Sequence, residues 1–299
     1  MTNRRQFLGS LSGAVAATVM PAAETERRNR GLGYGLYGMK KVPLDSALGH
    51  CAEIGYRHVE FALYPGYGVS PDELSPGRRA EIRRRLGSLR LGLSAMKLRL
   101  GPEFNPAGAA ANARSLAAAA ALARDLAPED PPALVLMPDG KPGEWERLKE
   151  TLVGGLQRWA DVAAPFGVVL AVKAHVGNAV DTPEKLLWLL RRANRPALRA
   201  VYDHSHFELA GLTLEASLRQ VAPQMTLVHV KDVRRTPRGH EFVLPGDGGT
   251  DFGRYAALLR EVGFAGPIVV EVSTHVFSQP GYDPLATALR AYRALALMV

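Results

Sequence analysis

The chain alternates strand-like and helix-like segments eight times between residue 31 and residue 299. The strand-like segments are short apolar runs bounded by turn residues, at 31–38, 56–63, 91–98, 133–137, 167–174, 198–203, 225–232 and 267–272. Such runs are typical of buried parallel strands, and their strict alternation with helices predicts helical crossovers. The regular order favours a closed (β/α)8 barrel, a single TIM barrel domain over 31–299, rather than an open doubly wound sheet. GLGYGLYGM also lacks the GxGxxG spacing of a dinucleotide site.

Composition agrees with a single globular domain. The sequence is 47% hydrophobic and 22% charged, and α/β barrels commonly have about 250 residues. No apolar run approaches the roughly 20 residues that cross a bilayer, so we expect no membrane span. Much of the net charge of +8 lies near the N-terminus and on one predicted helix surface, at Arg4, Arg5, Arg27, Arg28, Arg30, Arg78, Arg79, Arg83, Arg84 and Arg85. A solvated helix face explains this better than a nucleic-acid site, so we expect no nucleic-acid partner.

The N-terminal segment NRRQFLGSLSGAVAATVMPAA resembles a twin-arginine export signal. Arg4 and Arg5 precede a weakly apolar stretch that ends in small residues, which is the order such signals have. We expect residues 1–23 to be the signal peptide and 24–30 a short linker. The protein is then expected to be periplasmic or otherwise extracytoplasmic; a disordered cytoplasmic tail is the alternative.

Polar residues close four of the predicted strands in the second half of the chain. They are Lys173 and His175, Asp203 and His206, His229 and Lys231, and Glu271. The carboxyl ends of all strands of an α/β barrel meet on one face, so we expect these residues to converge. An unpaired aspartate is costly to bury, so Asp203 is expected to face a partner or a metal, with a helix cap as the alternative.

The seventh strand, MTLVHVKD, has a side-chain alternation that places two polar residues on one side. His229 and Lys231 are expected to point into the barrel, and Asp232 away from it. Asp203, His229 and Glu271 form an oxygen and nitrogen donor set that suits Mn²⁺ or Zn²⁺. A satisfied core histidine is the alternative for His229, and an ion pair with Lys231 is the alternative for Glu271.

Together these motifs resemble the xylose isomerase-like TIM barrels, a superfamily with sugar and sugar-phosphate isomerases, epimerases and endonuclease IV type enzymes. The resemblance spans residues 31 to about 295. It is carried by GYRHVE at the second strand, DHSH after the sixth, HVKD in the seventh and LPGDGGTDFGRYAALLREVGFAGPIVVE before the end. Glu60 closes the first of these motifs, and the sequence leaves open whether it holds a substrate hydroxyl, orients a ligand or forms a salt bridge.

The resemblance implies roles for individual residues. Asp203, His229 and Glu271 would be the metal ligands, and Glu271 would also be catalytic, exchanging a proton on a carbon next to a carbonyl. His206 and Arg235 match positions that bind substrate oxygens in ketose 3-epimerases. The full set of expected substrate-binding residues is Glu60, His175, His206, Lys231 and Arg235.

The fifth strand departs from the family pattern. Where relatives read Leu-x-Leu-Glu-Asn-His, this chain reads LAVKAH, so Lys173 replaces a carboxylate while His175 is retained. A unit charge about 4 Å from a dication costs about 8 kcal/mol at an effective dielectric near 20. Lys173 could point away and leave three ligands, could be neutral and act as the catalytic base, or could take the place of the metal.

The sequence therefore predicts an exported isomerase or epimerase that acts on a small sugar or polyol with a divalent metal. The same enolisation would serve a lyase or dehydratase on a keto-sugar. A metal-free carbohydrate-binding barrel, with Lys173 replacing the cation, is a second hypothesis. An endonuclease IV-like nuclease is disfavoured, because the third and fourth strand ends offer Lys97 and Asp139 rather than histidine. A homo-oligomer is compatible with the sequence.

Overall fold

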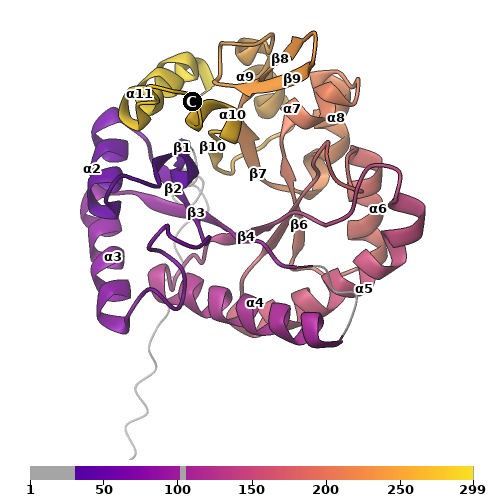
Figure 1. The fold of residues 1–299 in the computed structure, drawn as a ribbon, viewed down its shortest axis with the longest axis horizontal. Helices are drawn as coiled ribbons and strands as arrows, with labels where there is room; N and C mark the ends of the chain where they lie inside the picture. The colour runs from indigo at the N-terminus through magenta and orange to yellow at the C-terminus, as the bar shows by residue number, and fades with distance from the viewer. Residues whose placement is uncertain (1–30, 102–105, 299) are drawn as a thin grey trace, which may run out of the picture.

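Eight parallel strands close into a barrel in the order β1-β10-β7-β6-β5-β4-β3-β2 (Figure 1). The computed structural model describes residues 31–101 and 106–298, so the expected signal and linker lie outside the described residues. The strands are β1 (Leu32–Gly35), β2 (His58–Ala62), β3 (Gly92–Lys97), β4 (Ala133–Leu136), β5 (Leu170–Lys173), β6 (Leu198–Tyr202), β7 (Met225–Val230) and β10 (Ile268–Val270). Each lies within a strand predicted from the sequence, so the predicted (β/α)8 barrel is confirmed.

Eight helices between the strands also match the prediction. They are α2 (Leu44–Ile54), α3 (Pro76–Leu89), α4 (Pro106–Leu126), α5 (Trp145–Ala163), α6 (Pro183–Ala193), α8 (Leu214–Val221), α9 (Phe252–Glu261) and α11 (Pro284–Ala294). Two short helices, α7 (His204–Leu209) and α10 (Thr274–Phe277), were not predicted. Short 3-10 turns lie at η1 (Leu36–Met39), η2 (Ala164–Phe166), η3 (Ala222–Gln224) and η4 (Ala296–Met298). None of the helices within 31–101 and 106–298 is long and apolar enough to cross a membrane.

Helix starts follow the local chemistry of the sequence. The side chain of Thr182 accepts a hydrogen bond from the backbone N–H of Lys185, and Pro183 takes the first helical position of α6. Asp251 caps α9 in the same way. These contacts satisfy backbone donors that the first helical turn leaves without a partner. The starts of α6 and α9 are therefore fixed by residues next to them in the sequence.

Two apolar layers hold the barrel together. A large cluster packs the outward side chains of the strands against the helices. A smaller cluster fills the barrel interior with Ala95, Ala133, Val135, Ala171, Val201, Leu227 and Val269. Side chains two residues apart on a strand share a face, so the next inward residues lie one layer closer to the carboxyl end. These are Lys97, Met137, Lys173, Asp203, His229 and Glu271. All but Met137 are polar, so the barrel presents a polar layer above an apolar floor.

Glu60 of β2 faces the barrel interior, and a bulge in the neighbouring β3 brings an interior residue of β3 opposite it. The register shifts between Val59 and Glu60, so that Val59 pairs with Leu93 and Glu60 pairs with Ala95. Because Ala95 faces the interior, its partner Glu60 does so too. The extra residue of this bulge is Ser94, and it keeps the interior face of β3 aligned with Glu60.

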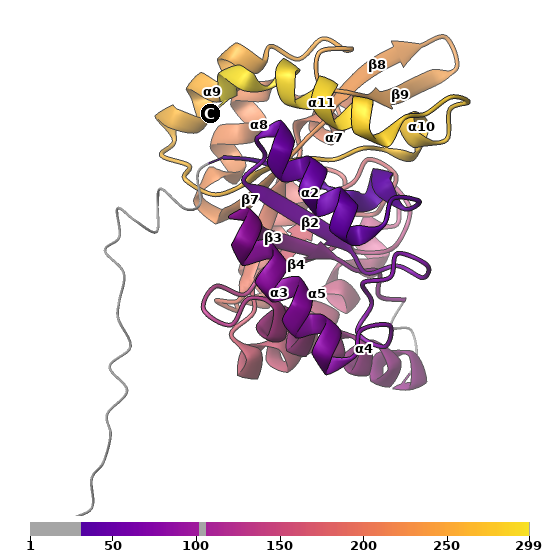
Figure 2. The same ribbon diagram turned by 90° about the vertical axis from the view of Figure 1, so that its left-hand side faces the viewer.

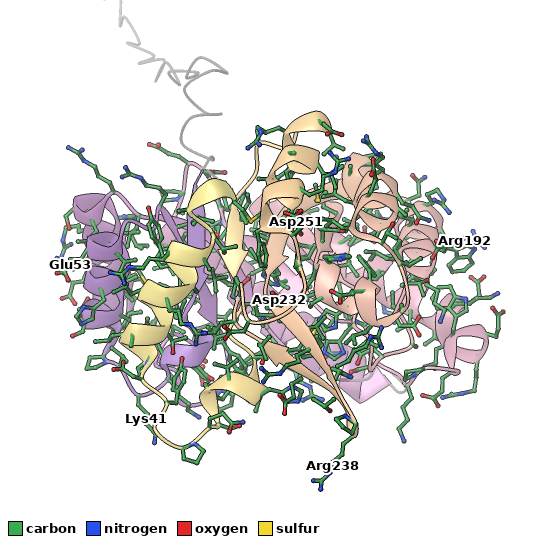
Figure 3. All side chains as sticks on the ribbon, turned by 90° about the horizontal axis from the view of Figure 1, so that it is seen from above. Lys41, Glu53, Arg192, Asp232, Arg238 and Asp251 are labelled. Atoms are coloured by element: carbon green, nitrogen blue, oxygen red, sulfur yellow. The ribbon has the colours of Figure 1, made fainter. Side chains whose placement is uncertain are left out.

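A hairpin that the sequence reading did not predict follows β7 directly. It consists of β8 (Asp232–Thr236) and β9 (Gly239–Val243), which pair antiparallel. Figure 3 shows Arg238 at its tip. Ser273 donates a hydrogen bond to the carbonyl oxygen of Phe242 at 3.1 Å, and the Phe242 N–H donates to His275 Nδ1 at 2.9 Å. The hairpin therefore lies beside α10 at one end of the barrel (Figure 2).

Asp232 organises the loop between the hairpin and α9. As the alternation predicts, its side chain points away from the polar layer. Its carboxylate accepts hydrogen bonds from the backbone N–H groups of Gly246, Gly248 and Thr250 at 3.2, 3.0 and 3.3 Å, and from the Thr250 hydroxyl at 2.8 Å. A fully buried carboxylate needs such donors. The aspartate of the HVKD motif, Asp232, therefore anchors this loop.

The close approach of this loop to Asp232 gives a stability prediction. A Cβ at Gly248 would overlap the Asp232 carboxylate and the Val233 carbonyl oxygen, whereas a Cβ at Gly249 would meet nothing within 4 Å. Gly248→Ala should lower the free energy of unfolding by about 1–3 kcal/mol through overpacking. Gly249→Ala, the matched control, should change it by no more than about 0.5 kcal/mol. Urea unfolding measures both, and equal midpoints for the two variants would refute the prediction.

Candidate functional site

A cavity of about 400 Å³ opens at the carboxyl-terminal end of the barrel. Its polar lining comes from the strand ends and the loops that follow them: Lys97, His175, His206, Lys231 and Glu271. Its aromatic lining comes from Tyr37, Tyr64, Phe242, His240 and His275. Cavities of this size hold ligands of the size of a monosaccharide or larger. The structure thus brings four of the predicted site residues and Lys97 to one cavity.

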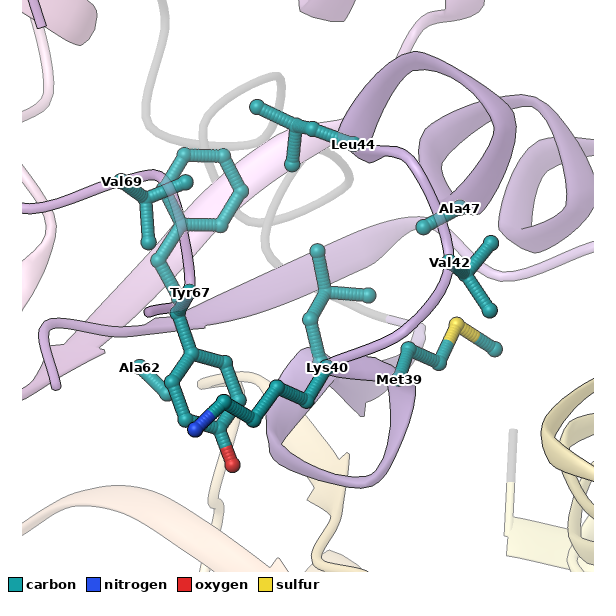
Figure 4. A pocket seen from close by; sticks show the side chains of 10 residues that line it. Met39, Lys40, Val42, Leu44, Ala47, Ala62, Tyr67 and Val69 are labelled. Carbon is teal, nitrogen blue, oxygen red and sulfur yellow. The ribbon is translucent and has the colours of Figure 1, made fainter. Parts of the chain in front are cut away.

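A second cavity, between η1, α2 and the loop after β2, has no such chemistry. It encloses about 20 Å³ and is lined mostly by aliphatic side chains, among them Met39, Val42, Leu44 and Val69 (Figure 4). That volume admits about one water molecule. A hollow of about 600 Å³ between β9, α10 and α11 is more voluminous, but none of the strand-end residues predicted for the site lines it. The candidate functional site is therefore the cavity of about 400 Å³ at the strand ends, called the larger cavity below in contrast to that of Figure 4.

Glu271 lies at the centre of the polar layer, with its side chain 12% exposed to the larger cavity. Lys97 donates to its Oε1, while Lys173 and Lys231 donate to its Oε2 at 2.7 and 2.6 Å. Burial alone would raise the pKa of Glu271, but the charges of Lys173, Lys231 and Lys97 outweigh it and hold this pKa well below its usual range. Glu271 is therefore a carboxylate at neutral pH.

Asp203 serves both the site and the fold. Its Oδ1 accepts hydrogen bonds from the N–H and the hydroxyl of Ser205, at 3.2 and 2.6 Å, and so caps α7. Its Oδ2 faces Lys173 at 2.8 Å and accepts a hydrogen bond from Lys231. Burial acts to raise the pKa of Asp203, and the two lysines lower it well below the usual value. From the sequence, a helix cap and a charged partner are alternative roles for Asp203. In the structure Asp203 has both.

The three lysines differ in exposure and in charge balance. Lys173 is 1% exposed and does not line the cavity, whereas Lys97 and Lys231 do. Burial lowers the pKa of Lys173. The carboxylates of Asp203 and Glu271 raise this pKa again, but the net shift is downward. Burial also lowers the pKa of Lys97 and Lys231, but their carboxylate partners raise it above the usual value. The sequence-based alternative in which Lys173 points away from the site is wrong, because its amine lies at the centre of the cluster.

His229 connects Lys173 to Glu60. The Lys173 amine lies 3.0 Å from His229 Nδ1, and His229 Nε2 lies 2.7 Å from Glu60 Oε2. His229 is fully buried, and burial lowers its pKa more than the nearby Glu60 raises it. Glu60 is 2% exposed and does not line the cavity. Of the roles that the sequence left open for Glu60, the structure shows a salt bridge, to Lys97 at 3.8 Å, beside the hydrogen bond from His229.

His175 and His206 stand side by side in the cavity wall, with ring centroids 4.2 Å apart. Burial and the charges of Lys173 and Lys231 lower the pKa of His175 to about 4. Burial and Lys231 also hold the pKa of His206 well below its usual value. Both imidazoles are therefore neutral at pH 7 and can exchange hydrogen bonds with hydroxyl groups.

Arg235 lies apart from this cavity. It is exposed on β8, and its Nη2 donates to the carbonyl oxygen of Glu208 at 3.2 Å. It does not contribute to the lining of the larger cavity. Its role in substrate binding stays a prediction, as do the catalytic roles of Glu271 and Lys173.

Sequence reasoning missed Lys97 as a member of the site, together with the aromatic residues of the cavity wall. The signal for Lys97 was present, since it follows the interior residue Ala95 by two positions, as Lys173 follows Ala171. The signal for Phe242 was weaker. TPRG between two short runs marks a hairpin turn, but nothing local shows that β9 returns to the cavity.

The predicted metal ligands do not fit a divalent ion in this arrangement. Asp203, His206 and Glu271 each offer a ligand atom within 4.8 Å of one another, which alone would allow a metal. The Lys231 amine, however, contacts all three. The Lys173 amine likewise contacts all three predicted ligands, Asp203, His229 and Glu271. Each set of donors is therefore already saturated by a lysine.

Comparison with known proteins places the chain in a family. The chain is 28% identical over 133 residues to inosose isomerase of Bacillus subtilis (strain 168), which covers 42% of this chain and 48% of that protein. It is 33% identical over 144 residues to inosose dehydratase of Geobacillus kaustophilus (strain HTA426), covering 43% and 45%. The chain thus spans about half the length of the curated relatives it matches, both of which carry enzyme names.

The crystal structure of the IolI protein with a zinc atom superposes on 90% of this chain and 99% of that one, with a TM-score of 0.75 and 20% identity. That likeness shows the fold. The family model described as xylose isomerase-like TIM barrel matches residues 48–295. The chain belongs to the xylose isomerase-like TIM barrel family.

Proposed function

We propose that this protein is an enzyme that moves a proton on the carbon next to the carbonyl group of a sugar or a cyclic polyol ketone. The observation that carries the proposal is Glu271, the one carboxylate among the cavity-lining residues, held between the ammonium groups of Lys97 and Lys231. The inosose isomerase and dehydratase among the relatives support the same chemistry.

The cavity wall suits a polyhydroxylated substrate. His175 and His206 are neutral and offer hydrogen bonds to hydroxyl groups without adding charge. Tyr37, Tyr64 and Phe242 offer flat apolar faces that pack against the C–H side of a sugar ring. Substrate hydroxyls would thereby hold the reacting carbon at the Glu271 carboxylate.

The reaction would begin with transfer of a proton from carbon to Glu271. The C–H bond breaks, an O–H bond forms on the carboxyl group, and the electron pair moves onto the carbonyl oxygen as an enolate. The negative charge thus leaves Glu271 and appears on the substrate, where Lys97, which contacts Glu271 and lines the cavity, can pair with it. The total charge of the site does not change, and this compensates for the weak basicity of Glu271.

The fate of the enolate decides the product. Return of the proton to the neighbouring carbon gives an isomer, and return to the opposite face of the same carbon gives an epimer. Loss of a β-hydroxyl group, protonated to water by the proton that Glu271 has taken up, gives a dehydration product, and His175 lies in the cavity wall where its N–H could hold that hydroxyl group by a hydrogen bond. The similarity to an inosose dehydratase favours dehydration as the alternative to isomerisation or epimerisation.

Glu271→Gln tests the assigned proton acceptor. Incubation of an inosose in D₂O should give deuterium at the carbon next to the carbonyl, visible by NMR, with the wild-type protein. Glu271→Gln should slow this exchange by about 10²-fold or more, because an amide does not accept the proton. Glu53→Gln, the same change at an exposed position of α2, should leave the exchange unaltered.

Exchange that survives Glu271→Gln would remove Glu271 from this role. Binding of inososes and ketoses with no exchange in the wild-type protein would instead support the carbohydrate-binding barrel. The two results are distinguishable because the first changes one variant and the second concerns the wild-type protein.

Lys97→Gln tests the site of oxyanion stabilisation. Lys97 contacts Glu271 and lies at 5.4 Å over the ring of Tyr37, at the edge of the cavity. Loss of its charge should lower kcat by roughly 10²-fold with a smaller change in KM, because the enolate charge forms only in the transition state. Lys141→Gln, at an exposed position, is the control. An effect on KM alone would show that Lys97 serves only to bind the substrate.

Export through the twin-arginine route is part of the proposal and rests on the N-terminal sequence alone. Joint substitution of Arg4→Lys and Arg5→Lys should retain the protein in the cytoplasm, since the route depends on the paired arginines. Cell fractionation followed by immunoblotting measures the outcome. Joint substitution of Arg27→Lys and Arg28→Lys is the matched control. Equal periplasmic amounts for both double variants would contradict this route.

A further inference from the structure

The amine of Lys173 lies where the predicted ligands of the metal converge. Its contacts are Asp203 Oδ2 at 2.8 Å, Glu271 Oε2 at 2.7 Å and His229 Nδ1 at 3.0 Å. An ammonium group has three N–H donors and no acceptor, so three acceptors satisfy it completely. A metal bound by the same three atoms would sit about 2.0–2.2 Å from each of them and would overlap the Lys173 nitrogen.

The surroundings of His229 have the pattern of a metal-bound histidine. The hydrogen-bond network assigns the ring proton to Nε2, which donates to Glu60 at 2.7 Å, and leaves Nδ1 as the acceptor for Lys173. Metal-binding histidines are oriented in this way, with the second nitrogen donating to a carboxylate. Here the carboxylate and the histidine keep that arrangement, and the cation that they face is Lys173.

The second group of candidate ligands is saturated in the same way. Lys231 donates to Asp203 Oδ2 and to Glu271 Oε2, the latter at 2.6 Å, and lies 3.2 Å from His206 Nε2. Asp203 Oδ2 and Glu271 Oε2 therefore each bridge two ammonium groups. No ligand atom of either group remains without a lysine.

The charges of the polar layer are balanced as they stand. Three lysines, Lys97, Lys173 and Lys231, face three carboxylates, Glu60, Asp203 and Glu271, and all six are buried or nearly so. A dication would add two charges with no counter-charge among these six side chains. Uncompensated buried charge is strongly unfavourable.

We propose that the ammonium groups of Lys173 and Lys231 replace the divalent cation in this barrel, so that the site binds neither zinc nor manganese. Lys173 takes the position of the metal, and Lys231 neutralises the carboxylate oxygens that remain. Occupancy of the site by these ammonium groups does not depend on which reaction the protein performs.

The metal content of the full-length protein tests this proposal directly. Cells are grown with added zinc and manganese, and the purified protein is analysed by inductively coupled plasma mass spectrometry and titrated with Zn²⁺ and Mn²⁺ by calorimetry. We expect much less than one equivalent of metal per chain. Any heat of binding in the calorimetric titration should be the same for the wild-type protein and for Glu271→Gln, because it would not come from this site. About one equivalent of metal per chain, removed by a chelator and taken up again, would overturn the proposal.

Lys173→Glu gives the converse test. The variant removes the ammonium group and adds a fourth ligand beside Asp203, His229 and Glu271, so it should retain about one equivalent of zinc and gain thermal stability when zinc is added. Lys41→Glu makes the same change of charge at an exposed position (Figure 3) and should gain neither. A folded Lys173→Glu protein that takes up no more zinc than Lys41→Glu would contradict the assignment, and if Lys173→Glu does not fold, the wild-type metal content decides.

Discussion

The buried carboxylate of Glu271, which accepts hydrogen bonds from three lysines, is the interaction on which the mouth of this barrel depends. Each ion of the cluster would cost several kcal/mol to bury alone. The cluster is stable because every lysine faces at least one carboxylate and every carboxylate faces at least one cationic or histidine partner. Removal of any one member leaves another buried charge without compensation, so the six charged residues act as a unit.

The barrel supplies the space that this cluster needs. Lys97 and Lys173 each follow an interior alanine by two residues, Ala95 and Ala171. Small side chains in the layer below leave room for the aliphatic parts of the two lysines to cross the barrel. A layer of larger branched residues at these positions would fill that space. The small size of Ala95 and Ala171 is therefore what allows Lys97 and Lys173 to reach the polar layer.

The strands and helices were predictable because their signals are local. A buried parallel strand is an apolar run, and Thr182 with Pro183 marks the start of α6 without reference to the rest of the chain. The hairpin β8–β9 was not predicted, because its strands are short, partly exposed and largely polar, and its position is fixed by contacts with α10. Elements held by tertiary contacts leave little trace in their own sequence.

The sequence predicted most of the residues that form the site, but few of the contacts between them. Asp203, His229 and Glu271 converge as their strand positions require, yet their common partner, Lys173, was one of three outcomes that the sequence allowed. The contact between Glu60 and His229 joins two strands, β2 and β7, that are not neighbours in the barrel, and no local pattern shows it. Pairing across a barrel is decided by register and stagger, which the sequence of a single strand does not contain.

An ammonium group does not reproduce all the properties of a dication. It carries half the charge, its donors are directional, and once its three protons are engaged it has none left for a substrate. Lys173 and Lys231 each contact three acceptors, so their part is to hold Asp203, His229 and Glu271 in place.

Lys97 differs from the other two lysines. It makes one hydrogen bond to Glu271, lies 3.8 Å from Glu60 and reaches the cavity wall, so it keeps capacity to donate to a bound carbonyl oxygen. In a metal-dependent site a single ion both organises the carboxylates and polarises the substrate. The geometry of this barrel divides the two tasks, with organisation at the buried centre and polarisation at the rim beside Tyr37.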